Sequence, residues 1–198
     1  MASPRKRSLS LSWWQAGNVA AVRIYTRTGD DGTTGLLYGG RVRKDDPRPV
    51  AFGSVDELQA AVGVARAQLG SGNSVGELLI EIERDLYVVM GELSTLPENH
   101  SKLKPGLTLV TEEMVKRLED LIDQYSALFE PPKDFVLPGE NIVAAFLDVA
   151  RTAARRAERY CVSIAAADSY VLRYVNRLSD LLWVLARWQE GESRLARD

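Results

Sequence analysis

The feature that most constrains this chain is a set of five stretches in which apolar residues recur every three or four positions. That spacing places the apolar side chains on one face of a helix. The five stretches begin near Val55, Leu79, Met114, Ile142 and Val171. Strand signals are nearly absent, apart from short pieces near residues 22–25 and 36–38. Five amphipathic helices with modest connections predict an all-α protein built as an antiparallel five-helix bundle.

Composition limits the classes of function that such a bundle can have. The 198 residues are enough for one well-buried domain and few for two. A net charge of −2 gives no reason to expect a nucleic acid partner, which usually needs a basic stripe. One cysteine, Cys161, and one histidine, His100, exclude an internal disulfide and argue against a His-based metal centre or a Ser-His-Asp triad. No apolar run approaches the roughly 20 residues of a membrane span, so no membrane partner is expected.

The first residues differ in composition from the rest of the chain. Residues 1–23 are basic and Ser-rich and contain no acidic residue, as organelle transit peptides often do. A disordered leader or an early start codon explains the same composition, and we favour it. The predicted organisation is therefore a leader at 1–23, one helical-bundle domain at 24–190 and a tail at 191–198. The expected location is cytoplasmic, or the mitochondrial matrix if the leader is a transit peptide.

A Gly- and Thr-rich stretch, YTRTGDDGTT at residues 25–34, contains almost nothing that a core can bury. Its composition fits an exposed turn, and it equally fits a loop whose N–H groups and hydroxyls hold a phosphate. Cations follow in GGRVRKDDPR, where they would neutralise a polyphosphate. The chain has no GxxxxGK[ST] motif, and Asp30 and Asp31 lack the later carboxylates of an EF-hand. The residues alone leave both interpretations open.

Two of the predicted helices have unusual polar faces. In ARTAARRAERYC, Arg151, Arg155, Glu158 and Arg159 lie about one turn apart beside small alanines. The fifth predicted helix groups Asn176 with a serine and an aspartate. A solvated face with intrahelical ion pairs is the simpler explanation, and ligand binding is the alternative.

Two further segments have structural interpretations. In FGSVDELQ, Ser54 and Glu57 have capping-box spacing, which predicts a helix start there. Asp56 would then lie in the first turn, where the helix dipole favours a carboxylate. Phe135 precedes a Pro-Gly turn in FVLPG, and a phenylalanine in this place is usually a core residue.

A known family contains six of these segments in the same order: TRTGDDG, RVRKDDPR, GSVDEL, FVLPG, ARTAARRAER and NRLSDLLWVLAR. Over roughly residues 24–188 the chain resembles the ATP:cob(I)alamin adenosyltransferases of the PduO type. The resemblance implies a five-helix bundle that forms a homotrimer with active sites between subunits. It implies transfer of the 5′-deoxyadenosyl group of ATP to the Co(I) of reduced cobalamin, giving adenosylcobalamin and triphosphate. A non-catalytic trimeric carrier or sensor that binds ATP or corrinoid is the alternative.

The resemblance also implies roles for individual residues. An ATP clamp near the N-terminus would contain Thr26, Arg27, Thr28, Gly29, Thr34 and Lys44. The residues expected to meet the nucleotide from a neighbouring subunit are Arg155, Arg156, Glu158 and Arg159, and Asn176 would also contact ATP. Asp56 and Arg151 would form a salt bridge between subunits beside the corrinoid. Phe135 would fill the lower axial position of the cobalt.

The implied chemistry agrees with the residue types that are present. The implied catalytic set is Arg155, Glu158, Asp56, Arg151 and Phe135. Because the nucleophile is Co(I) of the substrate, the protein needs no Ser, Cys or His nucleophile. Mg²⁺ is the implied partner of the triphosphate, with no ligands assigned, and a corrinoid reductase or a mutase is an implied protein partner. Gln59 and Glu140 depart from the usual family residues.

Overall fold

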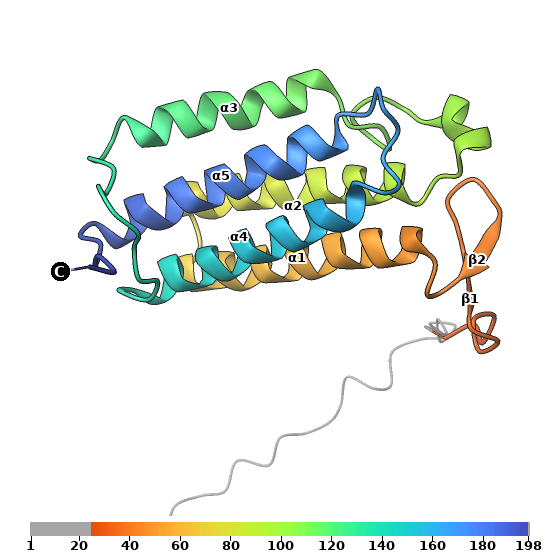
Figure 1. Cartoon of the computed structure of the whole chain (residues 1–198), viewed down its shortest axis with the longest axis horizontal. Coiled ribbons are helices and arrows are strands. Elements are labelled where there is room, and N and C mark those ends of the chain that lie inside the picture. Colours follow the sequence, from red (N-terminus) through yellow and green to blue (C-terminus); the bar gives the residue numbers. More distant parts are fainter. Residues whose placement is uncertain (1–24, 198) are drawn as a thin grey trace, which may run out of the picture.

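Five long α-helices lie side by side in the computed structural model, which describes residues 25–197 (Figure 1). They are α1 (Pro47–Leu69), α2 (Ser74–Leu93), α3 (Glu112–Ser126), α4 (Ile142–Cys161) and α5 (Val171–Glu190). A 3-10 helix, η2 (Pro97–Lys102), follows α2. The predicted, mostly helical architecture is confirmed.

A small antiparallel sheet precedes the helices. It consists of β1 (Thr33–Gly35) and β2 (Arg41–Arg43), which project beyond the N-terminal end of α1 (Figure 1). The strand predicted near 36–38 is displaced: β1 ends at Gly35, and of these three residues only Leu37 makes an isolated bridge, to Thr95. The piece predicted near 22–25 lies outside the described residues except for Tyr25, which is not in a strand.

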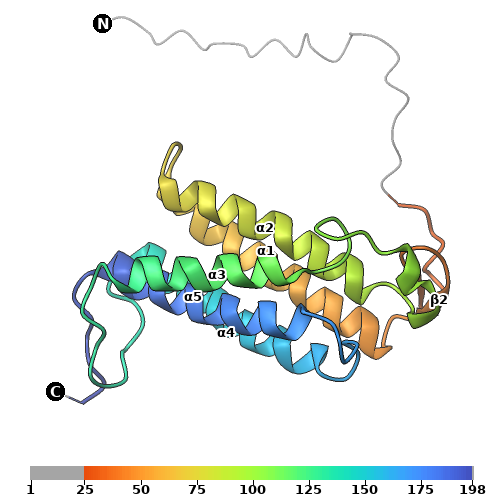
Figure 2. The ribbon, with the colours of Figure 1, turned by 90° about the horizontal axis from the view of Figure 1, so that it is seen from above.

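The helices bury one apolar stripe each. Helix α1 packs against α2 and α4, α4 also packs against α5, and α5 also packs against α3 (Figure 2). Each helix contributes a leucine of at most 1% exposure to the common core: Leu58, Leu86, Leu118, Leu147 and Leu178. Burying each such side chain contributes about 1.5–3 kcal/mol. No helix among residues 25–197 is both long enough and apolar enough to cross a membrane.

Helix α1 begins earlier than expected. The Asp46 side chain accepts a hydrogen bond from the Arg48 N–H at 2.9 Å, and Pro47 occupies the first helical position, where its missing N–H costs nothing. Ser54 therefore lies inside the helix and donates its hydroxyl to the Val50 carbonyl oxygen at 2.9 Å. The predicted capping box, and with it the first-turn position of Asp56, is wrong.

A buried carboxylate connects three helices. Asp85 of α2 is 9% exposed and accepts a hydrogen bond of 2.9 Å from the hydroxyl of Tyr174 of α5. Arg117 of α3 also pairs with it. Burial, reinforced by the Asp85 charge, raises the pKa of Tyr174, so its hydroxyl stays protonated and acts as the donor.

The segment after α5 returns to the loop before α4. The Leu137 N–H donates to the Arg194 carbonyl oxygen at 2.8 Å, and the Ala196 N–H donates to the Phe135 carbonyl oxygen at 2.7 Å. The Arg194 guanidinium also lies 3.1 Å from the Glu140 carboxylate. We call this contact between residues 135–137 and 194–196 the tail–loop pairing.

Candidate functional site

The Gly/Thr-rich loop folds tightly onto the β1–β2 sheet. A Cβ placed on Gly29 would lie 2.9 Å from the Thr33 carbonyl oxygen and 3.3 Å from the Lys44 Nζ, so only glycine fits without movement. The Lys44 N–H donates to the Gly32 carbonyl oxygen at 2.9 Å, which closes the loop. The structure therefore brings the Lys44 ammonium directly beside Gly29.

The first residues of the loop carry backbone strain and exposed hydroxyls. Arg27 has φ of 62°, a left-handed conformation that is unfavourable for a residue with a side chain. The hydroxyls of Thr26 and Thr28 lie 2.8 Å apart, and both residues are exposed. Thr34 lies in the middle of β1, opposite Val42. Strained backbone of this kind is concentrated at functional sites.

Asp31 shapes the turn that leads into β1. Its Oδ1 accepts hydrogen bonds from the Thr33 N–H at 2.9 Å and the Thr33 hydroxyl at 2.7 Å, and these bonds lower the pKa of Asp31. Arg41 donates to the same hydroxyl and, at 2.5 Å, to the Thr28 carbonyl oxygen. Arg41 is a member of this site that sequence reasoning did not assign, although it stands among the cations of GGRVRKDDPR.

A polar cluster lies between α4 and α5. Asn176 donates its amide to Glu158 Oε1 at 2.9 Å and accepts from Arg177 Nη1 at 2.7 Å, so both ends of the amide are held. Asp180 lies near this cluster, and the charged side chains of the cluster act on its carboxyl group. Burial raises the pKa of the Asp180 carboxyl. The positive charges of Arg177 and Arg155 act against this rise, and the negative charge of Glu158 adds to it. The structure thus joins Glu158 to Asn176, and Arg155 lies one turn before Glu158 on α4.

The other two arginines of RRAER make contacts of their own. Arg156 Nη2 lies 2.5 Å from the Glu57 carboxylate of α1, on a different side of α4 from Glu158. Arg159 is exposed and donates to the Arg155 carbonyl oxygen at 2.9 Å. Neighbouring residues on a helix are 100° apart, which explains why this segment is divided between two neighbouring helices.

Phe135 and Arg151 line one cavity of about 320 Å³. Phe135 is 79% exposed, so the interpretation of this residue as part of the core is wrong. Trp183 and Arg187 of α5, one turn apart, line the same cavity and were not identified from the sequence. Asp56 is exposed and makes no ion pair with any residue between 25 and 197, so no Asp56–Arg151 contact occurs within one chain.

Within one chain the two parts of the expected ATP site are not connected. Among the hydrogen bonds and ion pairs of the described residues, none joins the segment 25–44 to α4 or α5. The loop stands at the end of α1, and the Glu158–Asn176 cluster lies between α4 and α5 (Figure 1). The described chain therefore shows no direct polar contact between the two parts of the expected ATP site.

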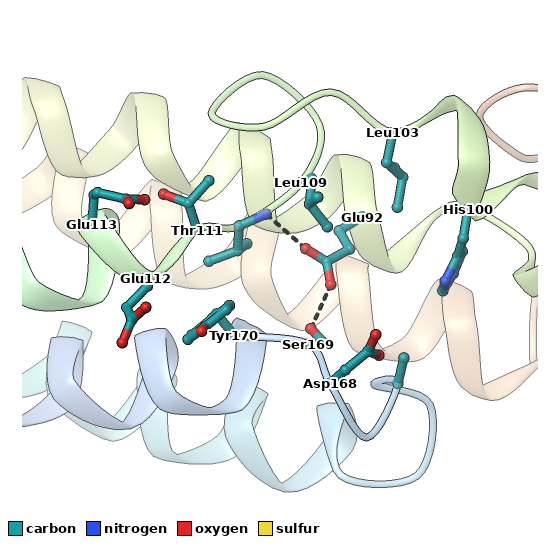
Figure 3. Close-up of a pocket in the computed structure, with 12 residues that line it drawn as sticks. Glu92, His100, Leu103, Leu109, Thr111, Glu112, Glu113, Asp168, Ser169 and Tyr170 are labelled. Atoms are coloured by element: carbon teal, nitrogen blue, oxygen red, sulfur yellow. Dashed lines mark hydrogen bonds between the residues drawn. The ribbon is translucent and has the colours of Figure 1, made fainter.

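A second cavity, of about 440 Å³, contains none of the expected site residues (Figure 3). It lies where η2, the start of α3 and the segment before α5 meet. Its buried carboxylate, Glu92, accepts hydrogen bonds from the Val110 N–H at 2.7 Å and from the Ser169 hydroxyl. Glu92 therefore ties α2 to the segments before α3 and before α5, and each of its carboxylate oxygens accepts one hydrogen bond.

Comparison with known proteins identifies the family. The sequence pattern of cobalamin adenosyltransferases matches residues 24–189. A corrinoid adenosyltransferase of Mycobacterium tuberculosis is 41% identical over 194 residues, covering 90% of this chain and 98% of the relative. The corrinoid adenosyltransferase of Citrobacter freundii is 42% identical over 171 residues, covering 85% of this chain and 95% of the relative.

A solved structure gives the same result. It is a variant of the PduO-type ATP:corrinoid adenosyltransferase of Lactobacillus reuteri, complexed with cobalamin and ATP. The two folds superimpose with a TM-score of 0.79 at 33% identity, covering 89% of this chain and 97% of the other. The chain therefore belongs to the cobalamin adenosyltransferase family.

Proposed function

We propose that this protein transfers the 5′-deoxyadenosyl group of ATP to the Co(I) of reduced cobalamin, giving adenosylcobalamin and triphosphate. The observation that carries the proposal is the Glu158–Asn176 hydrogen bond, one turn from Arg155 on α4, in a chain that belongs to this family. The corrinoid adenosyltransferase names of the relatives support the reaction. The neighbouring structure that is complexed with cobalamin and ATP supports the two substrates.

The loop at the end of α1 would hold the phosphates of ATP. Lys44 supplies a cation beside Gly29, and Thr26 and Thr28 are exposed. Hydroxyl and backbone N–H donors together with one cation in a tight loop suit the binding of a polyphosphate. We also assign Arg27 and Thr34 to this clamp.

The polar face of α4 would complete the nucleotide site. Arg155 and Arg159 are exposed one turn apart, so their guanidinium groups can meet several phosphate oxygens. Charge forms on the triphosphate as the bond from C5′ to oxygen breaks, and fixed guanidinium groups stabilise that charge. The Glu158–Asn176 pair holds the amide at one position, and Arg156 would brace α4 against α1 through Glu57.

The reaction places few chemical demands on the protein. Co(I) supplies the electron pair of the new Co–C bond, and the triphosphate leaves with the electron pair of the C5′–O bond. The protein must therefore align C5′ with the cobalt and stabilise the leaving group. We propose that the exposed ring of Phe135 covers the lower face of the cobalt and that Arg151 contacts the corrinoid side of the site.

We propose that the active unit is a homotrimer with sites between subunits. Ile142, Val149 and Tyr160 are 61%, 54% and 43% exposed and, at spacings of seven and eleven, share one face of α4. An apolar stripe of this kind suits contact with a second copy of the chain. Arg151, nine positions after Ile142, lies on the opposite side of α4 from this stripe. The pairing of Asp56 with Arg151 of the next subunit is therefore proposed from the family resemblance and not from the stripe.

Mg²⁺ is proposed to accompany ATP. The ion usually binds phosphate oxygens, waters and one or two carboxylates, so it requires no dedicated cluster of side chains. Asp31 is engaged by Thr33, whereas Asp30 is an exposed carboxylate of the same loop. A corrinoid reductase that supplies Co(I) and a mutase that uses the product are the proposed protein partners.

An anaerobic assay tests the function. Purified protein with reduced cobalamin and MgATP should form adenosylcobalamin and triphosphate in equal amounts. Absence of product with fully reduced cobalamin would refute the proposal. A protein that binds both ligands without turnover would be a carrier or sensor. Light scattering should give three times the chain mass of 21.9 kDa.

A further inference from the structure

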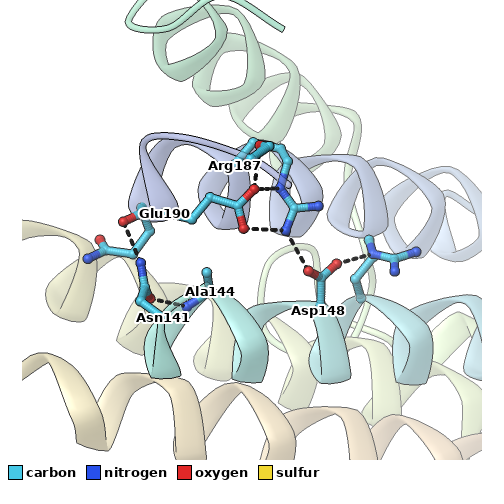
Figure 4. Close-up of polar contacts among 8 residues, drawn as sticks. Asn141, Ala144, Asp148, Arg187 and Glu190 are labelled. Atoms are coloured by element: carbon cyan, nitrogen blue, oxygen red, sulfur yellow. Dashed lines mark hydrogen bonds and ion pairs between the residues drawn. The ribbon is translucent and has the colours of Figure 1, made fainter. Parts of the chain in front are cut away.

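A cluster of four charged side chains lies between α4 and α5, and all but Arg151 are buried (Figure 4). Asp148 of α4, 4% exposed, is at its centre. Its Oδ2 accepts from Arg187 Nη2 at 2.6 Å, and its Oδ1 accepts from Arg151 Nε at 2.7 Å. Figure 4 shows Asp148 and Glu190 on either side of the Arg187 guanidinium.

Glu190 of α5 pairs with the Arg187 guanidinium on the side away from Asp148. Its Oε2 accepts from Arg187 Nη2 at 3.1 Å, and its Oε1 lies 2.8 Å from Arg187 Nε without the geometry of a hydrogen bond. The cluster thus contains two carboxylates and two guanidinium groups, and its formal charges cancel. Glu190 makes no contact with Arg151 among the interactions of the described residues.

Stability alone does not explain this cluster. Burying charged groups costs several kcal/mol of desolvation each, and apolar replacements of buried ion pairs are often neutral or stabilising. What the cluster does achieve is geometric. Asp148 accepts from Arg187 through Oδ2 and from Arg151 through Oδ1, so it anchors the Arg151 Nε directly. Within the cluster, Glu190 contacts only Arg187.

The anchored guanidinium lies at the cavity that also contains Phe135. Arg151 and Arg187 both line this cavity, and the Arg151 side chain is 25% exposed. Nε of Arg151 is the nitrogen that Asp148 engages. Its two terminal nitrogens make no hydrogen bond to any residue in the part of the chain that the structure describes, so they can meet a partner outside it.

We propose that Asp148 is a positioning residue for the corrinoid side of the reaction. It holds the Arg151 guanidinium at the cavity and leaves the terminal nitrogens to contact the corrinoid or the neighbouring subunit. This inference rests on the proposed function and adds to it a residue that touches neither substrate. Asp148 acts through Arg151 and has no effect on the corrinoid without it.

Steady-state kinetics of adenosylcobalamin formation test the proposal, with reduced cobalamin and MgATP varied in turn. Asp148→Asn keeps the shape but loses the charge, and a charge-assisted hydrogen bond is worth about tenfold or more. We expect the KM for reduced cobalamin to rise about tenfold, with the KM for ATP within about twofold of wild type. The matched control is Glu190→Gln, which removes a carboxylate from the same buried arginine, and we expect it to leave both constants within about twofold.

A double-variant comparison separates positioning from loss of structure. In an Arg151→Ala background, Asp148→Asn should leave the KM for reduced cobalamin unchanged, whatever it does to the melting temperature. The same rise with and without Arg151, or an equal rise in Glu190→Gln, would overturn the proposal. If Asp148→Asn does not fold, Asp148→Glu takes its place, because it keeps the charge while displacing the carboxylate.

Binding measurements keep the test independent of turnover. Equilibrium titration of the same variants with cob(II)alamin in the presence of ATP should show the same pattern in the dissociation constants. Wild type that binds but makes no adenosylcobalamin contradicts the proposed function alone. Wild type that turns over, with Asp148→Asn unchanged in both measurements, contradicts the positioning role alone.

Discussion

The hydrogen bond between Tyr174 and Asp85 allows a quantitative prediction for the substitution Tyr174→Phe. The hydroxyl donates at 2.9 Å to a carboxylate that is 9% exposed, and Tyr174 itself is fully buried. A hydrogen bond to a charged group contributes about 1.5–3 kcal/mol. Phenylalanine fills almost the same space, so no cavity term adds to this cost. Arg117 remains paired with Asp85, which keeps the loss within that range.

The assay is thermal unfolding at fixed protein concentration. For a chain of this size 1 kcal/mol corresponds to about 2–4 °C, so the melting temperature should fall by about 3–12 °C. Tyr125→Phe is the matched control, because Tyr125 is 8% exposed and packs edge-on against Trp188, with ring centroids 5.2 Å apart. Its hydroxyl makes no hydrogen bond to another residue of the described chain, so this variant should melt within about 1 °C of wild type. Equal melting temperatures for the two variants would refute the reasoning.

Three further predictions follow from single residues. Gly29→Ala places a methyl group 2.9 Å from the Thr33 carbonyl oxygen and should raise the KM for ATP about tenfold. The control is Gly53→Ala, whose methyl group meets nothing within 4 Å and should leave the KM for ATP unchanged. Equal KM values for ATP in the two variants would contradict the proposed ATP clamp. Phe135→Ala should reduce adenosylcobalamin formation at least about tenfold. The melting temperature should stay within about 1 °C of wild type, because the ring is 79% exposed. A large loss of stability would instead show that Phe135 belongs to the core. Burial raises the pKa of the Cys161 thiol to about 12, so the folded protein at pH 8 has almost no thiolate at this position. Cys161 should therefore react with a thiol reagent only after denaturation. Rapid reaction of the native protein would show that the thiol is not buried.

The helices were predictable because each carries its own periodic signal, and that signal depends on neighbours within one or two turns. The start of α1 was not predictable in the same way. Two cap signals compete there, Asp46-Pro47 and Ser54 with Glu57, and both fit a helix that continues to residue 69. A helix extends to the earliest compatible cap unless something blocks it, and prolines are tolerated in the first turn.

The candidate site shows a different limit. The segments that form it were recognisable, but the partners of their side chains were not. Arg156 and Glu158 are two residues apart and meet different helices, because the packing of α4 between α1 and α5 decides what each one faces. Asp148 and Arg187 are separated by 39 positions, and no local pattern connects them.

The tail–loop pairing has a consequence for measuring motion at the proposed corrinoid side of the site. The amide hydrogens of Leu137 and Ala196 are donated in opposite directions across one short junction. A single opening of that junction exposes both to deuterium, so they should exchange at matching rates although 59 positions separate them in the chain. Hydrogen–deuterium exchange of these two amides, measured by mass spectrometry, therefore reports opening of the loop without a probe attached to a side chain. Because Phe135 belongs to the same junction, protection of both amides on adding corrinoid would give the free energy by which substrate closes it.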